Sequence, residues 1–203
     1  MASTRHGSFT IVTDSREQAP WSFDSSPLYS DTSVTVGKLE SGDYSVKGLE
    51  SVVAIERKAL PDLIACLGRE RPRFERELER SRGLEFFGVV VESDFQSVAK
   101  GQYRSMLSPH SACQSICAWT ARWGVNFFFA GSRAAGEYVA WSLLKQFVEG
   151  KRKQLAAVER ALGSPAGACA RGMDNHKASE PEDVLDAFGA SEEASPEGRE
   201  ERQ

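Results

Sequence analysis

The sequence predicts an α/β fold in which helices flank a mixed sheet. Segments with strand signals alternate with segments with helix signals through residues 8–162. Residues 86–92 and 125–130 are continuous apolar runs, which are typical of strands buried on both faces. Residues 44–49 and 52–58 read as two strands joined by a short turn, and a hairpin adds an antiparallel pair. Alternating strands and helices favour layers packed around one sheet.

The first half of the chain supplies two further strands before the hairpin and two helices after it. Residues 8–13 form a β-rich run that ends at Asp14, and residues 33–39 alternate apolar and polar side chains before the turn residues at 41–43. After the hairpin, Pro61 is placed in the first turn of a helix that reaches residue 67. A second helix is expected over residues 72–82, ending at Gly83.

The second half is marked by clear helix signals. Ser108 and Pro109 have the residue types of an N-cap and a first helical position, and Gly124 ends that helix after residue 123. Ser132 caps a long final helix to about residue 162, with an interruption expected near Gly150.

Charge divides the chain at Gly163. Residues 164–203 hold ten acidic and four basic residues, a net charge of −6, which leaves 21 bases and 19 acids in residues 1–163, a net charge of +2. The segment is rich in Ala, Gly, Ser, Pro and Glu, so we expect a folded domain over 1–163 and a disordered acidic tail over 164–203. Between Asp183 and Phe188, apolar residues flanked by acids suggest a docking segment for a protein partner, although chance occurrence in a linker also explains them.

Acidic residues are expected at one edge of the sheet. Asp14, Glu56 and Glu92 end or follow strands, and Asp43 begins one. Lys58 shares a strand face with Glu56, because side chains alternate along a strand. Hard divalent cations prefer carboxylate oxygens, and a nearby lysine can stabilise developing charge on a phosphate. The set therefore indicates phosphodiester hydrolysis, although each acid alone could be a turn or cap residue.

These residues also carry a resemblance to a known family. Gly42-Asp43, Glu56-Arg57-Lys58 and Asp62 match the pattern G-D…E-R-K-x-x-x-D of the XPF-type endonucleases, named for the xeroderma pigmentosum group F protein. The chain also resembles the family in the D-x-R-E at residues 14–17 and in the strand-ending Glu92. The resemblance covers about residues 9–148 and implies a restriction-endonuclease-like fold and a nuclease domain over residues 1–163.

The resemblance implies roles for the site residues. Asp43 and Glu56 would bind Mg²⁺ or Mn²⁺, Asp14 would be a further ligand or hold water, and Lys58 would be catalytic. Arg57, on the opposite strand face, would be held by structural or substrate contacts. The remaining members of the motifs would support the site: Arg16, Glu17, Asp62 and Glu92.

A run of arginines follows the motif. The candidates for contact with DNA phosphates are Arg71, Arg73, Arg76 and Arg80. The last three recur at helical spacing, so they form one stripe, which fits phosphate contact and a solvated, salt-bridged face equally well.

The expected function is therefore a metal-dependent DNA endonuclease, acting at branched, flap or fork DNA in repair or recombination. A resolvase- or restriction-like nuclease and a non-cleaving DNA-binding or partner-docking module are the alternatives. The tandem helix-hairpin-helix elements of the family are not found after the final helix. DNA is the expected partner, with a homodimer or heterodimer left open. The sequence has no membrane-length apolar run or signal peptide, so we expect a cytoplasmic protein in bacteria or phage and a nuclear one in eukaryotes.

Overall fold

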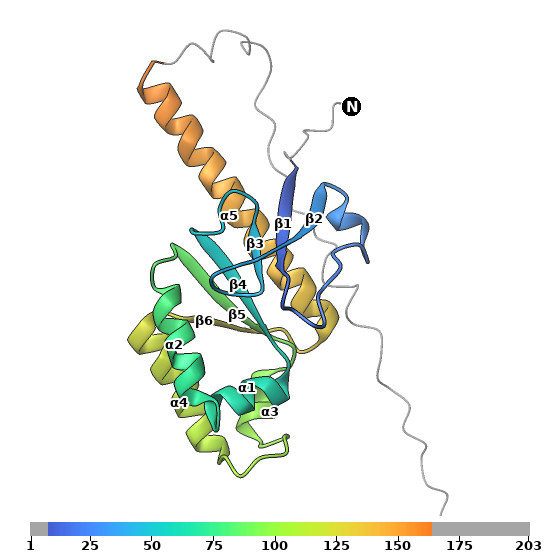
Figure 1. Cartoon of the computed structure of the whole chain (residues 1–203), viewed down its shortest axis with the longest axis vertical. Coiled ribbons are helices and arrows are strands. Elements are labelled where there is room, and N and C mark those ends of the chain that lie inside the picture. Colours follow the sequence, from blue (N-terminus) through green and yellow to red (C-terminus); the bar gives the residue numbers. More distant parts are fainter. Residues whose placement is uncertain (1–7, 164–203) are drawn as a thin grey trace, which may run out of the picture.

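A six-stranded mixed sheet forms the centre of the molecule in the computed structural model, which describes residues 8–163 (Figure 1). The strand order is β2-β1-β3-β4-β5-β6. The predicted acidic tail, including the docking segment between Asp183 and Phe188, lies outside the described residues. The strands are β1 Phe9–Asp14, β2 Thr32–Gly37, β3 Tyr44–Val46, β4 Val53–Lys58, β5 Phe86–Val91 and β6 Asn126–Phe129.

Strand direction brings the predicted site residues to one edge of the sheet. Strand β3 runs antiparallel to both of its neighbours, β1 and β4, whereas β4, β5 and β6 are mutually parallel. The carboxyl ends of β1, β4 and β5 therefore lie at the same edge as the start of β3. Asp14 ends β1, Asp43 precedes β3, residues 56–58 end β4 and Glu92 follows β5. The mixed sheet and its hairpin were both predicted, and both are confirmed.

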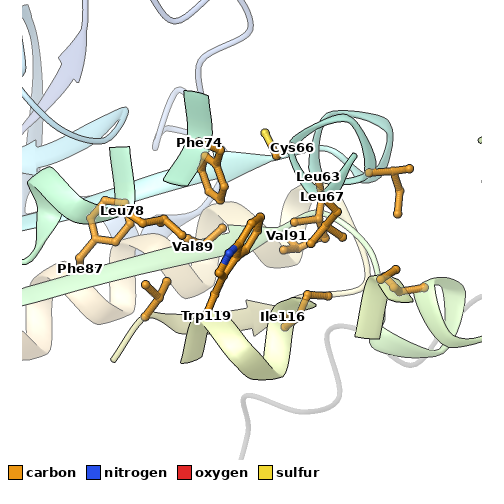
Figure 2. Close-up of a cluster of buried hydrophobic side chains, with 14 of the residues drawn as sticks. Leu63, Cys66, Leu67, Phe74, Leu78, Phe87, Val89, Val91, Ile116 and Trp119 are labelled. Carbon is orange, nitrogen blue, oxygen red and sulfur yellow. The ribbon is translucent and has the colours of Figure 1, made fainter. Parts of the chain in front are cut away.

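Helices cover both faces of this sheet. They are α1 Leu60–Leu67, α2 Arg71–Ser81, α3 Phe95–Ala99, α4 Pro109–Trp123 and α5 Arg133–Ala161, with a short 3₁₀ helix, η1, at Pro27–Tyr29. Side chains from α1, α2 and α4 pack with Ala54, Val89 and Val91 in one core cluster, drawn around Trp119 in Figure 2. Ile55 and Val90, which alternate with those strand residues, point to the other face and pack with α5. The central strands are therefore buried on both faces.

The predicted helix signals act as expected at most ends. The Ser108 hydroxyl accepts a hydrogen bond from the backbone N–H of Ser111, and Gly124 ends α4 in the left-handed conformation. The Ser132 hydroxyl likewise caps α5. The interruption predicted near Gly150 is wrong, because α5 continues unbroken to Ala161. One glycine costs a helix only about 1 kcal/mol, and the surrounding Glu, Lys, Arg and Gln residues favour helix.

Two further differences concern short or peripheral elements. Strand β6 was expected to be buried, but it is the edge strand, with Asn126 exposed and its three phenylalanines only half-buried. Helix α3 and η1 were not predicted, because five and three residues show no clear periodicity. None of the helices within residues 8–163 has the length and apolarity of a membrane span.

Candidate active site

The turn before β3 sets Asp43 beside Glu56. Gly42 has a φ of 76°, and a Cβ atom on it would lie 2.9 Å from the carbonyl oxygen of Ile55. This close approach lets the Asp43 N–H donate to that carbonyl at 2.8 Å. The Asp43 carboxylate accepts a hydrogen bond from the Arg57 N–H at 2.8 Å through Oδ2. The glycine therefore fixes the aspartate against the end of β4.

Glu56 is a buried carboxylate with one oxygen unpaired. Its side chain lies on the same face of β4 as Lys58, as predicted, and Lys58 Nζ forms an ion pair with Glu56 Oε1. Glu56 is only 3 % exposed, and its Oε2 atom is buried without a hydrogen-bond partner. Lys58 Nζ also lies 5.1 Å from the centroid of the Phe74 ring, which supports the lysine from α2. Lys58 therefore compensates the negative charge at Oε1, and Oε2 remains free to bind another group.

Burial changes the pKa values of Asp43, Glu56 and Lys58. Burial, followed by the negative charge of Glu56, raises the pKa of Asp43 to about 8. Burial also raises the pKa of Glu56, although the charge of Lys58 opposes it. For Lys58, burial would lower the pKa, but Glu56, with smaller contributions from Cys66 and Asp43, outweighs burial and the pKa is raised. Two carboxylates that resist ionisation side by side are a favourable place for a cation.

Asp14 has no such free oxygen. Oδ1 accepts hydrogen bonds from the Arg16 N–H at 2.8 Å and Nε at 2.7 Å, and Oδ2 accepts from Arg16 Nη2 at 3.0 Å and from the Leu39 N–H at 2.7 Å. Burial opposes ionisation of Asp14, but these bonds outweigh it and lower its pKa. Asp14 therefore anchors Arg16 and the loop after β2. Its predicted contact with a metal, which would have to replace one of these bonds, stays a prediction.

Arg57 points to the opposite side of β4 and joins several elements. Its guanidinium makes two 2.8 Å hydrogen bonds to Glu92 and a 3.4 Å contact with Glu17, and it lies over the ring of Trp21. Glu92 also accepts hydrogen bonds from Trp21 Nε1 at 3.0 Å and from Arg133 of α5 at 3.1 Å. The contacts of Arg57 are thus structural. Glu92 holds Arg57 in place and does not itself line the cavity described below.

A cavity of about 650 Å³ collects most of the predicted residues. Lys58 and both acids of the proposed metal pair line it, and helix α2 contributes further charged residues. The predicted site residues that line the cavity are Asp14, Arg16, Glu17, Asp43, Glu56, Arg57, Lys58, Asp62, Arg73 and Arg80.

The four predicted arginines lie in three different surroundings. Arg73 and Arg80 line the cavity, whereas Arg76 is exposed outside its lining. Arg71 is held by Glu75 at 2.9 Å and by Ser115 at 2.7 Å, and its guanidinium stacks on Trp119. The contacts of Arg71 therefore belong to the packing of α2 on α4. Contact of any of the four with phosphate stays a prediction.

Several cavity residues were missed in the sequence analysis, and two of them are charged residues aligned with Arg73. Arg69 and Glu77 line the cavity together with Arg73, at intervals of four residues. The charge of Glu77 adds to the effects that raise the pKa of Glu56, so the two carboxylates face the same space. Extending the helical spacing from Arg73 in both directions would have found both residues.

The residues present suit a hard divalent cation. Within residues 8–163, no three His, Cys, Asp or Glu side chains form a ready-made metal cluster. Mg²⁺, however, is usually held by one or two carboxylates together with water and substrate phosphate. Asp43 and the unpaired Oε2 of Glu56 provide that pair.

Comparison with known proteins places the chain in a family. The family model described as the ERCC4 domain matches residues 13–140, more than half of the chain. The structure resembles XPF from Aeropyrum pernix, with a TM-score of 0.52, 19 % identity and coverage of 74 % of this chain and 73 % of that chain.

XPF from Aeropyrum pernix in complex with DNA gives a similar match, with a TM-score of 0.53, 19 % identity and coverage of 70 % and 66 %. No curated protein matches the sequence. The resemblance drawn from the sequence motifs and the expected fold are both confirmed. The chain belongs to the ERCC4 domain family and has the fold of the XPF nuclease domain.

Proposed function

We propose that this protein is a metal-dependent endonuclease that hydrolyses phosphodiester bonds in DNA. The observation that carries the proposal is the buried, unpaired Oε2 of Glu56, which lies in one cavity with Asp43 and Lys58. A buried carboxylate oxygen without a donor is costly, and a bound cation would remove that cost. Membership of the ERCC4 domain family supports the same reaction class.

Asp43 and Glu56 would hold Mg²⁺ or Mn²⁺. When bound, the metal would polarise the scissile phosphate and lower the pKa of a coordinated water. Gly42 and the Arg57 N–H keep the Asp43 carboxylate in place for this task. Asp14 contributes indirectly, because it fixes Arg16 and the loop at Leu39 beside the cavity.

Positive side chains would receive the DNA. Lys58 carries a charge next to Glu56, where it can stabilise the negative charge that develops on the phosphate oxygens. Arg69, Arg73 and Arg80 line the same cavity and would bind flanking phosphates. The complex of the similar Aeropyrum pernix XPF with DNA supports DNA as the substrate. Branched, flap or fork DNA, as met in repair and recombination, is the proposed substrate class.

A cleavage panel tests the reaction. Labelled duplex, flap, fork and four-way-junction DNA would be incubated with the full chain and Mg²⁺ or Mn²⁺, and with a chelator as the control. We expect metal-dependent cleavage with preference for a branched substrate. Absence of cleavage on every substrate would contradict the proposal and favour a non-cleaving DNA-binding module.

Calorimetry tests the metal pair separately. Mn²⁺ should bind the wild-type protein and bind Asp43→Asn much more weakly, because one of the two carboxylates is lost. Asp24→Asn is a matched control, since Asp24 is exposed and lies outside the cavity lining. Equal Mn²⁺ affinity of wild type and Asp43→Asn would show that the metal site is elsewhere.

A further inference from the structure

Helix α5 extends beyond the body of the molecule at its carboxyl end. Lys151 ties the helix to the body through an ion pair with Glu85, and Arg152 donates a 2.9 Å hydrogen bond to the Ser8 carbonyl. Residues 152–163 are all exposed, and this end of α5 projects past the sheet in Figure 1. The last turns of the helix therefore present a free surface.

An apolar stripe runs along this exposed end. Its members, Leu155, Val158 and Leu162, are 59 %, 52 % and 80 % exposed, and their spacing of three and four residues places them on one side of the helix. The α5 stripe continues a buried side, because Val148, seven residues before Leu155, packs in the core. Aligned apolar residues that extend a core face in this way indicate a surface that another segment covers.

The charge around the α5 stripe is positive. Lys151 and Arg152 lie one turn before the first leucine of the stripe. Residues 152–162 hold three bases and one acid, a net charge of +2. A second copy of the chain would bring the same positive charge against this surface, which opposes pairing of two α5 ends. The complementary occupant is a segment that is both apolar and acidic.

Residues 180–188 of the same chain have this composition. They contain four acids and no base, a net charge of −4. Val184, Leu185 and Phe188 supply three large apolar side chains within five positions. The segment includes the predicted docking residues and lies outside the described part of the chain. Its sequence therefore matches the α5 end in both charge and hydrophobicity.

The length of chain between the two regions permits contact. Asp183 follows Gly163 by 20 positions, the difference of the two residue numbers. That length of chain reaches up to about 65 Å when extended, whereas the α5 stripe, from residue 155 to 162, is only about 10 Å long. A tether of this kind also raises the local concentration of the segment, to the millimolar range for short linkers. A separate molecule would have to compete with it.

We infer that residues 180–188 dock on the exposed end of α5 and cover the α5 stripe with their apolar side chains. The docking segment predicted from the sequence thus binds its own chain. The contact goes beyond the proposed function and does not depend on it. It lies at the opposite edge of the sheet from the candidate active site, because Glu85, the partner of Lys151, precedes β5.

Hydrogen exchange of the full chain tests the docking. Mass spectrometry would follow the backbone amides of residues 153–162 in the wild type and in Leu185→Asp/Phe188→Asp. We expect exchange about tenfold faster in the variant, because a segment docked about nine-tenths of the time slows exchange by that factor. Met173→Asp is the matched control, since it adds an aspartate to residues 164–203 but outside the docking segment.

Charge reversal in the segment tests the electrostatic part. Asp183→Lys/Asp186→Lys should also speed the exchange of residues 153–162, because lysines would then face the positive end of α5. Asp174→Lys, which reverses an acid outside residues 180–188, should leave the exchange unchanged. A charge-reversed segment that protects the helix as well as the wild type does would contradict the inference.

A substitution on the helix tests the contact from the other side. Leu155→Glu should speed the exchange of residues 183–188, because it places a negative charge in the α5 stripe. Leu28→Glu is the control, since Leu28 is another exposed leucine and lies in η1. Thermal unfolding of each variant checks that residues 8–163 remain folded. Unchanged exchange of residues 183–188 in a folded Leu155→Glu protein would speak against docking on α5.

The remaining outcomes identify other occupants. Equal exchange of residues 153–162 in the wild type and in Leu185→Asp/Phe188→Asp would overturn the inference, as would equal acceleration by Met173→Asp. Protection that grows with protein concentration would assign the α5 stripe to a second copy, because docking within one chain is independent of concentration. These measurements use neither metal nor DNA, so their failure leaves the proposed function intact, and a lack of DNA cleavage leaves the docking intact.

Discussion

Glu56 carries an energetic cost that a purely structural residue would avoid. Its Oε1 atom is paired with Lys58, but its Oε2 atom is buried without a partner. An unsatisfied buried acceptor costs about 1–3 kcal/mol. Such exceptions call for an explanation, and a cation shared with Asp43 provides one. Burial raises the pKa of both acids, and a bound cation would offset this effect by stabilising their ionised forms.

Removal of Lys58 should separate catalysis from binding. In Lys58→Ala, we expect cleavage to fall about a hundredfold or more, because an electrostatic contact with the developing charge is lost. DNA affinity should change little, since the arginines of the cavity remain. Single-turnover cleavage and anisotropy measure the two effects. Lys47→Ala is the control, because Lys47 is exposed and lies outside the cavity, and this variant should cut DNA at the wild-type rate. A Lys58→Ala protein that also cuts at the wild-type rate would show that Lys58 is not catalytic.

The raised pKa of Asp43 predicts how the stability of the metal-free protein depends on pH. Its ordinary pKa of 3.8 rises to about 8 in the fold, so between these values the folded protein keeps a proton that the unfolded chain releases. The free energy of unfolding should therefore fall as pH rises from 5 to 8, by up to about 1.4 kcal/mol per pH unit for one such group. Urea titrations in EDTA at several pH values measure the slope, which Asp43→Asn should make shallower.

Asp94→Asn is the control for this pH effect. Asp94 caps α3, and the hydrogen bonds to Ser97 lower its pKa, so its contribution changes only below the range tested. Its variant should keep the wild-type slope between pH 5 and 8. An Asp43→Asn protein with an unchanged slope would show that Asp43 is ionised in the folded state at neutral pH.

At the level of elements, the turn before β3 places Asp43 of the Gly42-Asp43 motif beside the end of β4. Gly42 needs both a positive φ and the absence of a side chain, because a Cβ atom would meet the Ile55 carbonyl. Gly48, just after β3, has a φ of 84° but open space around it. A comparison of these two glycines, one on each side of β3, therefore separates the energetic cost of a positive φ from the cost of a steric contact.

Alanine substitutions at these glycines should have different effects. Gly48→Ala should cost about 1–2 kcal/mol from the left-handed conformation alone. Gly42→Ala should cost about 3 kcal/mol or more, because strain and the contact with Ile55 add, and it should also weaken Mn²⁺ binding by moving Asp43. Denaturant unfolding and calorimetry measure both variants. Equal effects of the two substitutions would mean that the close approach at Gly42 does not position the site.

Local signals explain which elements the sequence predicts well. The caps at Ser108, Gly124 and Ser132 act within one helical turn, and the structure confirms them. Burial of β6 was mispredicted because an apolar run such as residues 126–129 does not reveal whether a strand has one neighbour or two. The phenylalanines of β6 are only half-buried because β6 is an edge strand with one neighbour.

Distance along the chain explains what the sequence could not show of the site. The E-R-K motif and its aspartate lie within sixteen residues, and the hairpin joins them as predicted. The hydrogen bonds from Leu39 to Asp14 and from Trp21 to Glu92 link residues 25 and 71 positions apart. Contacts of that range depend on the complete topology, which no local pattern specifies.

At the scale of the whole molecule, the candidate DNA surface carries mixed charge. The cavity holds several carboxylates on the sheet edge, and Arg69, Arg73 and Arg80 lie on the side of α2. Residues 1–163 have a net charge of only +2, and residues 164–203 have −6. The acidic segment can therefore compete with DNA phosphates for the same arginines.

Removal of residues 164–203 should raise the affinity for plain duplex DNA. The increase should be larger at low salt, where screening is weak and the attraction between the acidic segment and the arginines is strongest. Cleavage of the preferred substrate at saturating DNA should barely change, because every proposed site residue precedes Gly163. Duplex titrations at two salt concentrations and a cleavage assay compare the truncated and full chains. A folded truncated protein that binds duplex more weakly, or does not cut, would show that the segment takes part in the active enzyme.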